Sequence, residues 1–495
     1  MIPAHNKQFL LTKEPLSDPF FDDWKKIDIG GYRLYAQRNL KVSEVQHEGV
    51  SLIALGNIYD YRYPELSIAQ IAKRIAQGRD LGKIIEEYSE SCGESVLIIE
   101  LNNQLYLLND ACAQMEVYYT TDFQVFGSQP KLIEKVATLD LDRSPRALKH
   151  YSSHAFKKKK TLVFNKTPFK NLLHLTPNHC LDISKKMVFR FHPTKHLENH
   201  SLQIVAEKVE AILAGYLKSM VNRGEIVLPI TGGIDSRTIL VCALKHLSTE
   251  ELKRVRYFII ELPWMKDDHP DLHIAKQIAE RLNLDLEIRK LDKGSKPTND
   301  LVFDESLTLH DSAFNPIANH AFGHYGSKDT TVVDGSIIGV VKNFYGQLLA
   351  PNARDIARIT GYPKSAYAIN AIRSWLKQSK KLFDSLGYHL LDMLFWEERA
   401  GNWAARSKSK FLMVCNHVSI FNSRRLFDTM LNTKRKYRDA QMHKIFDSIL
   451  ANAELPIHDI PINPTPKKKL IILAKKTGLY PLYRNLAIKS GLLKF

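Results

Sequence analysis

A glycine pair between an apolar segment and an amphipathic segment constrains this sequence most. Residues 226–230 have the composition of a buried strand, and residues 235–247 repeat apolar side chains at helical spacing. The turn between them contains Gly232 and Gly233, which have φ > 0 available, so the pattern predicts a sharp bend with free N–H groups facing one point. Because a helix N-terminus also attracts negative charge, we expect this turn to bind phosphate.

Side chains in the same turn extend the phosphate-binding prediction. The hydroxyls of Thr231 and Ser236 can donate to phosphoryl oxygens, and Asp235 can hold a magnesium ion on them. The turn lacks the lysine of the Walker loop and the glycine spacing of dinucleotide binders. The alternative is a purely structural turn in which Asp235 and Ser236 cap the helix.

The order of the expected elements predicts a two-domain α/β chain. The first 190 residues contain short strands, with an expected hairpin at 96–108 and a helix at 67–77, which indicates an antiparallel sheet. After a boundary near 193–200, a helix from residue 201 is followed by alternating strands and helices, which predict a parallel sheet. Those strands are expected at 226–230, 256–262, 286–290 and 330–334, with helices at 235–247 and 270–282 and a mostly helical region from 366 onward.

Composition narrows the class of protein. A hydrophobic share of 44% and a charged share of 25% over 495 residues exclude disordered, collagen-like and coiled-coil chains. Five scattered cysteines without a C-x-x-C pair predict a reducing compartment, and the missing apolar run of 18 residues argues against a membrane span. We therefore expect a cytoplasmic protein. Its net charge of +17 indicates either an anionic partner or a bias toward solubility.

Several motifs resemble one protein family. The segment T-G-G-I-D-S at 231–236 is similar to the S-G-G-x-D-S loop of the ATP pyrophosphatase superfamily, whose members cleave ATP between the α and β phosphates. Other segments resemble asparagine synthetases in their order along the chain, from about residue 95 to 464. They are Asp110 with Tyr118 and Tyr119, G-S-Q-P-K-L at 127–132, F-K at 169–170, L-T-P-N-H at 175–179, W-E-E-R at 396–399, Trp403, and I-F-N-S-R-R-L at 420–426.

The resemblance implies a domain plan and an activity. Residues 1–195 would form a glutaminase-fold domain of the Ntn-hydrolase type, residues 200–463 an ATP-binding synthetase domain of the ATP pyrophosphatase fold, and residues 464–495 a basic tail. The implied enzyme is an ATP-dependent carbon–nitrogen ligase that forms AMP. With ATP and Mg²⁺ it adenylates a small-molecule carboxylate, then transfers the acyl group to ammonia or an amine. The family holds adenine by backbone that corresponds to Ile259 and Ile260.

One departure from the family concerns glutamine hydrolysis. A working glutaminase of this class has cysteine after the initiator methionine, because that thiolate attacks the amide. Ile2 stands at this position, and the first cysteine is Cys92. We expect a degenerate domain without glutaminase activity. In this respect the chain is similar to the β-lactam-forming and lasso-peptide-cyclising relatives.

A second departure affects the synthetase signature S-G-E-G-x-D-E-x-F-G-G-Y. Gly335 and Tyr345 match it, whereas Ser336 replaces the family glutamate and Gly339 replaces the metal-binding aspartate. The resemblance leaves Asp334 as a substitute metal ligand and Lys342 as a cation for pyrophosphate. With Asp235, these two are the catalytic candidates. The lysine of a later family motif falls near Asp439, with Lys436 and Arg438 as replacements.

Further candidates surround these motifs. Asp311 and Asn315 lie where relatives place substrate-contacting residues. His320 and His324, with His310, have metal-like spacing, against the interpretation as polar residues of a cleft or a solvated face. Asp267, Asp268 and Asp271 are either a cation cluster or helix-capping residues before and after Pro270.

The basic tail carries eight Lys or Arg residues and no acid from residue 464 to 495. It suits an anionic membrane surface at the inner face, a packed helix pair with a solvated basic face, or nucleic acid, which is the least favoured because no nucleic-acid module is recognised. Three functions stay open: the amide ligase, with an amidated sugar acid as one substrate class; a nucleotide-binding pseudoenzyme or scaffold; and a tRNA-modifying enzyme. The sequence leaves a homo-oligomer open.

Overall fold

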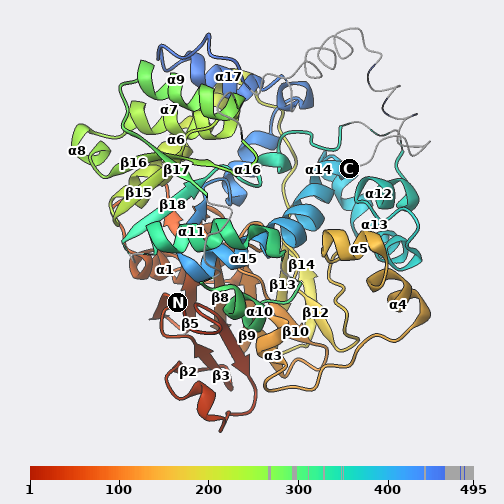
Figure 1. The fold of residues 1–495 in the computed structure, drawn as a ribbon. Coiled ribbons are helices and arrows are strands. Elements are labelled where there is room, and N and C mark those ends of the chain that lie inside the picture. The colour runs from red at the N-terminus through yellow and green to blue at the C-terminus, as the bar shows by residue number, and fades with distance from the viewer. Residues whose placement is uncertain are drawn as a thin grey trace.

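The computed structural model describes residues 1–265, 269–291, 298–309, 311–326, 329–346, 348, 350–439 and 442–462, together with 480, 484 and 486. It confirms an α/β chain with antiparallel sheets in its N-terminal part and a parallel sheet in its C-terminal part (Figure 1). The predicted basic tail lies almost entirely outside the described residues, as do His310, Asp267 and Asp268. No helix in the described part is long and apolar enough to cross a bilayer.

Two six-stranded antiparallel sheets build the N-terminal region. In spatial order the first contains β12 (Leu172–His174), β10 (Tyr118–Thr120), β11 (Val125–Gly127), β1 (Phe9–Thr12), β3 (Tyr32–Ala36) and β2 (Lys25–Ile29). The second contains β14 (Met187–Arg190), β13 (His179–Asp182), β9 (Gln104–Asn109), β8 (Ser95–Leu101), β5 (Val50–Gly56) and β4 (Val42–His47). Alternate residues of both sheets, including Phe9, Leu34, Ile53 and Leu107, share one buried core, so the sheets stack face to face.

The outer faces of this sandwich are also covered. Helices α1 (Ile68–Ala76) and α2 (Leu81–Ser89) pack on the second sheet, and α3 (Pro130–Ile133) packs on the first. The predicted hairpin is confirmed: β8 and β9 are joined at Asn102 and Asn103, whose φ values of 52° and 58° suit a type I′ turn. The N-terminal region thus has four layers.

The parallel sheet has the spatial order β17 (Leu286–Lys290), β16 (Val255–Glu261), β15 (Glu225–Pro229), β18 (Thr330–Asp334) and β19 (Asn416–Ser419). The first four strands confirm the predicted ones, each within two residues at either end, whereas β19 was not predicted. The chain runs outward from β15 through β16 to β17, then returns to place β18 on the other side of β15. Strand order therefore reverses between β15 and β18. In open parallel sheets, ligands bind beyond the carboxyl ends of the strands at such a reversal.

Helices bury both faces of the parallel sheet (Figure 1). One core combines inward residues such as Leu228 and Ile259 with α6 (Leu202–Val221), α7 (Ile234–His246), α9 (Pro270–Arg281) and α17 (Lys444–Ala451). The opposite core combines Val227 and Phe258 with α10 (Asp300–Ser306), α11 (Asn315–Tyr325) and α15 (Ala405–Val414). Burial on both faces explains why these strands read as continuous apolar runs.

The region after residue 350 is mainly helical, as expected. It contains α12 (Ala353–Ile359), α13 (Ala366–Leu386), α14 (Leu390–Leu394), the π-helix η4 (Phe395–Ala404), the short helix η5 (Arg435–Arg438) and, between α15 and α17, α16 (Arg424–Leu431). A π-helix of ten residues is unusual, because such helices occur mostly as single turns and often at functional sites.

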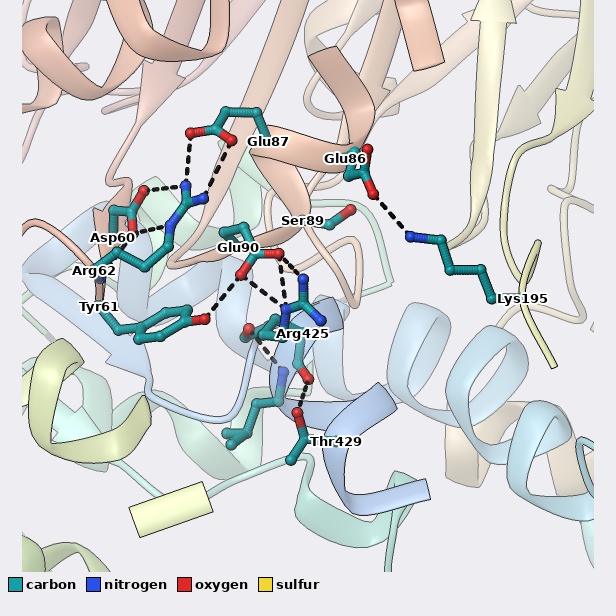
Figure 2. Close-up of polar contacts among 12 residues, drawn as sticks. Asp60, Tyr61, Arg62, Glu86, Glu87, Ser89, Glu90, Lys195, Arg425 and Thr429 are labelled. Carbon is teal, nitrogen blue, oxygen red and sulfur yellow. Dashed lines mark hydrogen bonds and ion pairs between the residues drawn. The ribbon is translucent and has the colours of Figure 1, made fainter. Parts of the chain in front are cut away.

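Ion pairs connect the N-terminal region to helix α16 and to the segment before α6 (Figure 2). Arg425 donates from Nε to both carboxylate oxygens of Glu90 at 2.8 Å, and the Tyr61 hydroxyl donates to the same carboxylate at 3.0 Å. Lys195 pairs with Glu86 at 2.8 Å. These contacts join the sandwich to the C-terminal region.

Candidate functional site

The predicted phosphate turn lies at the carboxyl end of β15, and α7 begins directly after it. The positive φ expected there is wrong for Gly233, whose φ is −78°. A Cβ atom on Gly233 would meet the Thr231 hydroxyl at 3.3 Å, a contact that a small shift relieves. The helix N-terminus, rather than a left-handed glycine, therefore supplies the bend.

The two predicted hydroxyls lie together in this turn. Thr231 Oγ1 and Ser236 Oγ are 2.7 Å apart, and the Gly233 N–H donates to Thr231 Oγ1 at 3.2 Å. The expectation of free N–H groups is therefore wrong for Gly233, because the hydroxyl of Thr231, two residues earlier, accepts from its N–H. The turn is closed by its own side chains.

A carboxylate accepts a hydrogen bond from the neighbouring backbone N–H group. Asp271, in the first turn of α9, accepts from the Gly232 N–H at 3.2 Å. The N–H of Gly232 is therefore also engaged, contrary to the expectation of a free donor. The contact shows that an anionic oxygen suits this turn, as the dipole of α7 favours. Of the three aspartates in the predicted cation or capping cluster, Asp271 is the one that the structure describes, and it bridges two helix N-termini.

Asp235 and Lys342 meet beside the turn. The Lys342 ammonium donates to Oδ1 of Asp235 and lies 5.4 Å from the centre of the Phe446 ring. Burial raises the pKa of Asp235, while Lys342 opposes that rise. The structure thus brings together two predicted catalytic residues from segments that follow different strands, β15 and β18.

The segment after β18 is packed tightly against both α7 and η4. A Cβ on Gly335 would stand 2.8 Å from the Asp235 Cβ, so glycine permits this close approach. A Cβ on Gly339 would stand 2.2 Å from the Phe395 ring. An aspartate has no room at position 339, and no metal ligand can occupy this place in the signature.

Asp334 is held by several partners. Its Oδ1 accepts from the Ser336 backbone N–H at 3.0 Å and from the Ser336 hydroxyl at 2.7 Å. Its Oδ2 lies 3.6 Å from Lys408 Nζ and 3.3 Å from His417 Nε2. Burial opposes ionisation, but Lys408, His417 and Ser336 together hold the pKa of Asp334 well below its usual value. Both oxygens of this predicted metal ligand are engaged.

Lys408 connects Asp334 to the N-terminal region. Its ammonium donates to Nδ1 of His417 and lies 3.6 Å from Oε1 of Glu94, which also accepts from the Ser419 N–H at 2.8 Å. Burial raises the pKa of Glu94 to about 7, and burial with the adjacent Lys408 lowers the pKa of His417. We call Asp334, His417, Lys408 and Glu94 the buried ion network.

Sequence reasoning singled out Asp334 but missed its three partners in the buried ion network. Glu94 precedes β8, Lys408 lies in α15 and His417 lies in β19. No spacing pattern links residues so far apart in the chain. The one local signal is the alternation of Arg406, Lys408 and Lys410 within α15, where all three side chains are buried.

The predicted adenine-binding residues lie in β16, beside β15. Ile259 is buried and pairs with Ile288 of β17, and Ile260 is half-buried on the opposite face. Both are near the carboxyl end of β16, at the sheet edge that also carries the phosphate turn. The exposed Trp264 follows three residues after the strand.

The predicted substrate residues gather around a lysine. Lys410 Nζ donates to the Asp311 carbonyl at 2.7 Å and to the Asn315 side chain. Burial lowers the pKa of Lys410 to about 8. Asn315 is buried at the start of α11, whereas Asp311 is half-exposed. The two predicted residues are thus close to each other, on the α11 side of the sheet.

The histidine pair is not joined by a third ligand in the described residues. The rings of His320 and His324 are 4.3 Å apart, and Nδ1 of His324 accepts from Arg289. Burial lowers the pKa of His320 to about 4. No group of three His, Cys, Asp or Glu residues within the described ranges could hold a metal ion.

Arg438 lies near Lys342, whereas Lys436 is exposed. The buried Arg438 guanidinium pairs with Asp392 at 2.9 Å and donates to the Val341 carbonyl at 3.5 Å. Of the two predicted replacements for the later family lysine, Arg438 is therefore the one that contacts the Lys342 segment.

Comparisons with known proteins leave the family open. No protein-family model matches the chain, and no curated protein matches it. Among solved structures, it is similar to a glutamine-dependent NAD⁺ synthetase from Acinetobacter baumannii in complex with ADP, with 14% identity and a TM-score of 0.19. The alignment covers 46% of this chain and 41% of that chain, so the chain spans less than half of the synthetase.

Proposed function

We propose that this protein is an ATP-dependent, AMP-forming amide ligase that resembles asparagine synthetases and lacks glutaminase activity. One observation carries the proposal: the Asp235–Lys342 ion pair stands where strand order reverses, between the ends of β15 and β18. Ligands of open parallel sheets bind at this place. The turn at 231–236 also resembles a pyrophosphate-binding loop.

The proposed reaction has two steps. An oxygen of the substrate carboxylate attacks the α-phosphorus of ATP, the bond from that phosphorus to the bridging oxygen breaks, and pyrophosphate leaves with its electron pair. Ammonia or an amine then attacks the acyl carbon, AMP leaves, and the nitrogen releases a proton. The first step creates negative charge on pyrophosphate, which fixed donors and cations can stabilise.

Lys342 would supply that stabilisation. Its ammonium already lies beside the N-terminus of α7, held by Asp235. A phosphate oxygen is a stronger partner than a half-buried carboxylate with a raised pKa, so Lys342 can pass from Asp235 to pyrophosphate. Asp271 must release the Gly232 N–H when phosphate enters.

The protein donors do not form a magnesium site. No group of three His, Cys, Asp or Glu side chains within the described residues could hold a metal ion, and both oxygens of Asp334 are engaged by Ser336, Lys408 and His417. The magnesium that accompanies ATP therefore belongs to the substrate in this proposal, and no step is assigned to a metal held by the protein.

The test of adenylation is ATP–pyrophosphate exchange. Radiolabelled pyrophosphate is incubated with ATP, the protein and a panel of carboxylic acids, including uronic and amino acids. We expect one acid class to stimulate label entering ATP, and Lys342→Ala to reduce the exchange rate by about 10²-fold, as for loss of one oxyanion donor. Lys253→Ala, an exposed charge change before β16, is the control. No exchange with any acid would contradict the ligase proposal.

A second candidate is a nucleotide-binding pseudoenzyme. It is favoured by the segment after β18, where Gly339 packs on Phe395 and Ser336 is bonded to Asp334. Neither position offers a free acid or base. ATP binding without pyrophosphate exchange would support this candidate over the ligase.

The N-terminal region would serve as a structural part rather than as an ammonia source. Ile2, at the position of the family nucleophile, packs in the same apolar cluster as Phe258 and Val332, and its N–H donates to Asn299. The Arg425–Glu90 pair joins this region to α16 (Figure 2). The contact of Glu94 with Lys408 joins it to the buried ion network. Free ammonia or an amine would be the nitrogen donor.

A further inference from the structure

A small cavity of about 210 Å³ lies between the N-terminal region and η4. Lys159, at the end of α5 (His154–Lys159), lines it from one side, and Glu398, Arg399 and Trp403 of η4 line it from the other. Tyr345 also lines the cavity. A cavity of this size admits a ligand of a few to a dozen heavy atoms.

Its cations are held in place by their surroundings. The Lys159 ammonium donates to the Thr360 carbonyl at 3.2 Å, and it lies 1.8 Å from where a Cβ of Gly361 would stand, so glycine leaves the space for it. Gly361 has a φ of 87°, which also requires glycine. The Arg399 guanidinium lies 4.7 Å from the Trp403 ring centre and 5.0 Å from that of Phe344.

The charge of the cavity wall favours an anion. Lys159 and Arg399 bring two positive charges, and Glu398 is the opposing acid in the lining. Burial raises the pKa of Glu398 to about 7, so at neutral pH it offsets only part of that charge. The remaining positive charge, next to the Trp403 ring, suits a small carboxylate with an apolar body.

The cavity is close to the proposed nucleotide site. Lys342, which contacts Asp235, and Tyr345, which lines the cavity, are three residues apart in one segment. Three residues span at most about 10 Å. The wall of the cavity and the lysine of the proposed nucleotide site therefore belong to one short segment of chain.

We propose that this cavity binds a small monocarboxylate, with Arg399 and Lys159 as its cationic partners. Its assignment as the seat of the acid substrate rests on the proposed function, whereas carboxylate binding itself does not. The N-terminal region would then also contribute to ligand binding, because Lys159 belongs to that region.

The experiment uses 4-fluorobenzoate as the probe, titrated into the full chain at pH 8 and low salt and followed by ¹⁹F NMR. Neutral 4-fluorobenzamide, of the same shape, is the ligand control. We expect the benzoate to bind more tightly than the benzamide. Arg399→Gln should weaken benzoate binding by about 10- to 100-fold, as for loss of a charged hydrogen bond. Lys157→Gln, at an exposed position on α5 near Lys159, should leave benzoate binding unchanged.

A variant that should tighten binding distinguishes a specific effect on the cavity from misfolding. Glu398→Gln removes the negative charge beside the ligand and should tighten benzoate binding at pH 8. Equal binding of benzoate and benzamide, or equal effects of Arg399→Gln and Lys157→Gln, would overturn the proposal. Benzoate binding that persists in Lys342→Ala supports the cavity independently of ATP. The two proposals can therefore fail separately: benzoate binding tests the cavity, and pyrophosphate exchange tests the ligase.

Discussion

Two aspartates at the ends of neighbouring strands differ in how firmly their partners hold them. Asp235 follows β15 and is held by Lys342, and its pKa is raised by burial. Asp334 ends β18 and is held by Ser336, Lys408 and His417, which keep its pKa well below the usual value.

The difference indicates which residues can take part in ligand exchange. Lys342 and Asp235 are more exposed, at 14% and 31% of their side-chain surface, than Lys408 and Glu94, at 3% and 0%, so Lys342 can leave for a phosphate. The buried ion network, including the fully buried Glu94, cannot rearrange without exposing several charges. We therefore assign ligand exchange to the Asp235–Lys342 pair and structural support to the buried ion network.

The largest expected effect concerns the buried ion network. Lys408→Met leaves the carboxylates of Asp334 and Glu94 without their shared cation, and we expect it to lower the free energy of unfolding by about 3–5 kcal/mol. Lys342→Met should cost less than Lys408→Met, because Lys342 has one carboxylate partner and its pair is more exposed. Chemical denaturation of both variants measures the contrast. Partial recovery in Lys408→Met with Asp334→Asn would confirm the cause, and equal losses in the two single variants would contradict the comparison.

Two glycine substitutions compare how tightly the two segments are packed. Gly339→Ala drives a methyl group into the Phe395 ring and should destabilise the protein by about 1–3 kcal/mol. Gly233→Ala meets one hydroxyl at 3.3 Å at an ordinary φ, so we expect a cost below about 1 kcal/mol. Thermal unfolding of both variants gives the order, and a larger loss at Gly233 would refute the packing account.

These contrasts also show what the sequence could and could not predict. The bounds of β15 and α7 follow from a local pattern of apolar residues and glycines, and they are confirmed within one residue. The hydrogen bonds of the turn between them depend on packing against Asp271 and were not predicted. β19 escaped prediction because Asn416–Ser419 contains one apolar residue and forms an edge strand. The buried ion network and the cavity escaped because packing, not spacing, brings their residues together.

The pH dependence of stability should differ in sign between the two aspartates. Since the pKa of Asp334 is lowered on folding, its ionised form adds stability that is lost as pH falls below about 4. Since the pKa of Asp235 is raised, its contribution is lost as pH rises above about 4. Comparing the wild type with Asp334→Asn and with Asp235→Asn from pH 3 to 7 should give slopes of opposite sign. Slopes of the same sign would contradict the difference between the two aspartates.

The smallest expected effect concerns Asp271. Its carboxylate accepts from the Gly232 N–H and would repel an incoming phosphate. Asp271→Asn removes the charge, keeps the shape, and should raise the affinity for a fluorescent ATP analogue by about fivefold. Glu280→Gln, an exposed position on the same helix, is the control. Weaker binding in Asp271→Asn would mean that this carboxylate assists the ligand.

Calorimetric titration of magnesium-ATP into the full chain tests the central assignment most directly. We expect a saturable heat in the wild type and in Lys253→Ala, and an affinity lower by about 10- to 100-fold in Lys342→Ala. Absence of heat in the wild type, or equal affinity in Lys342→Ala, would contradict a nucleotide site between the ends of β15 and β18.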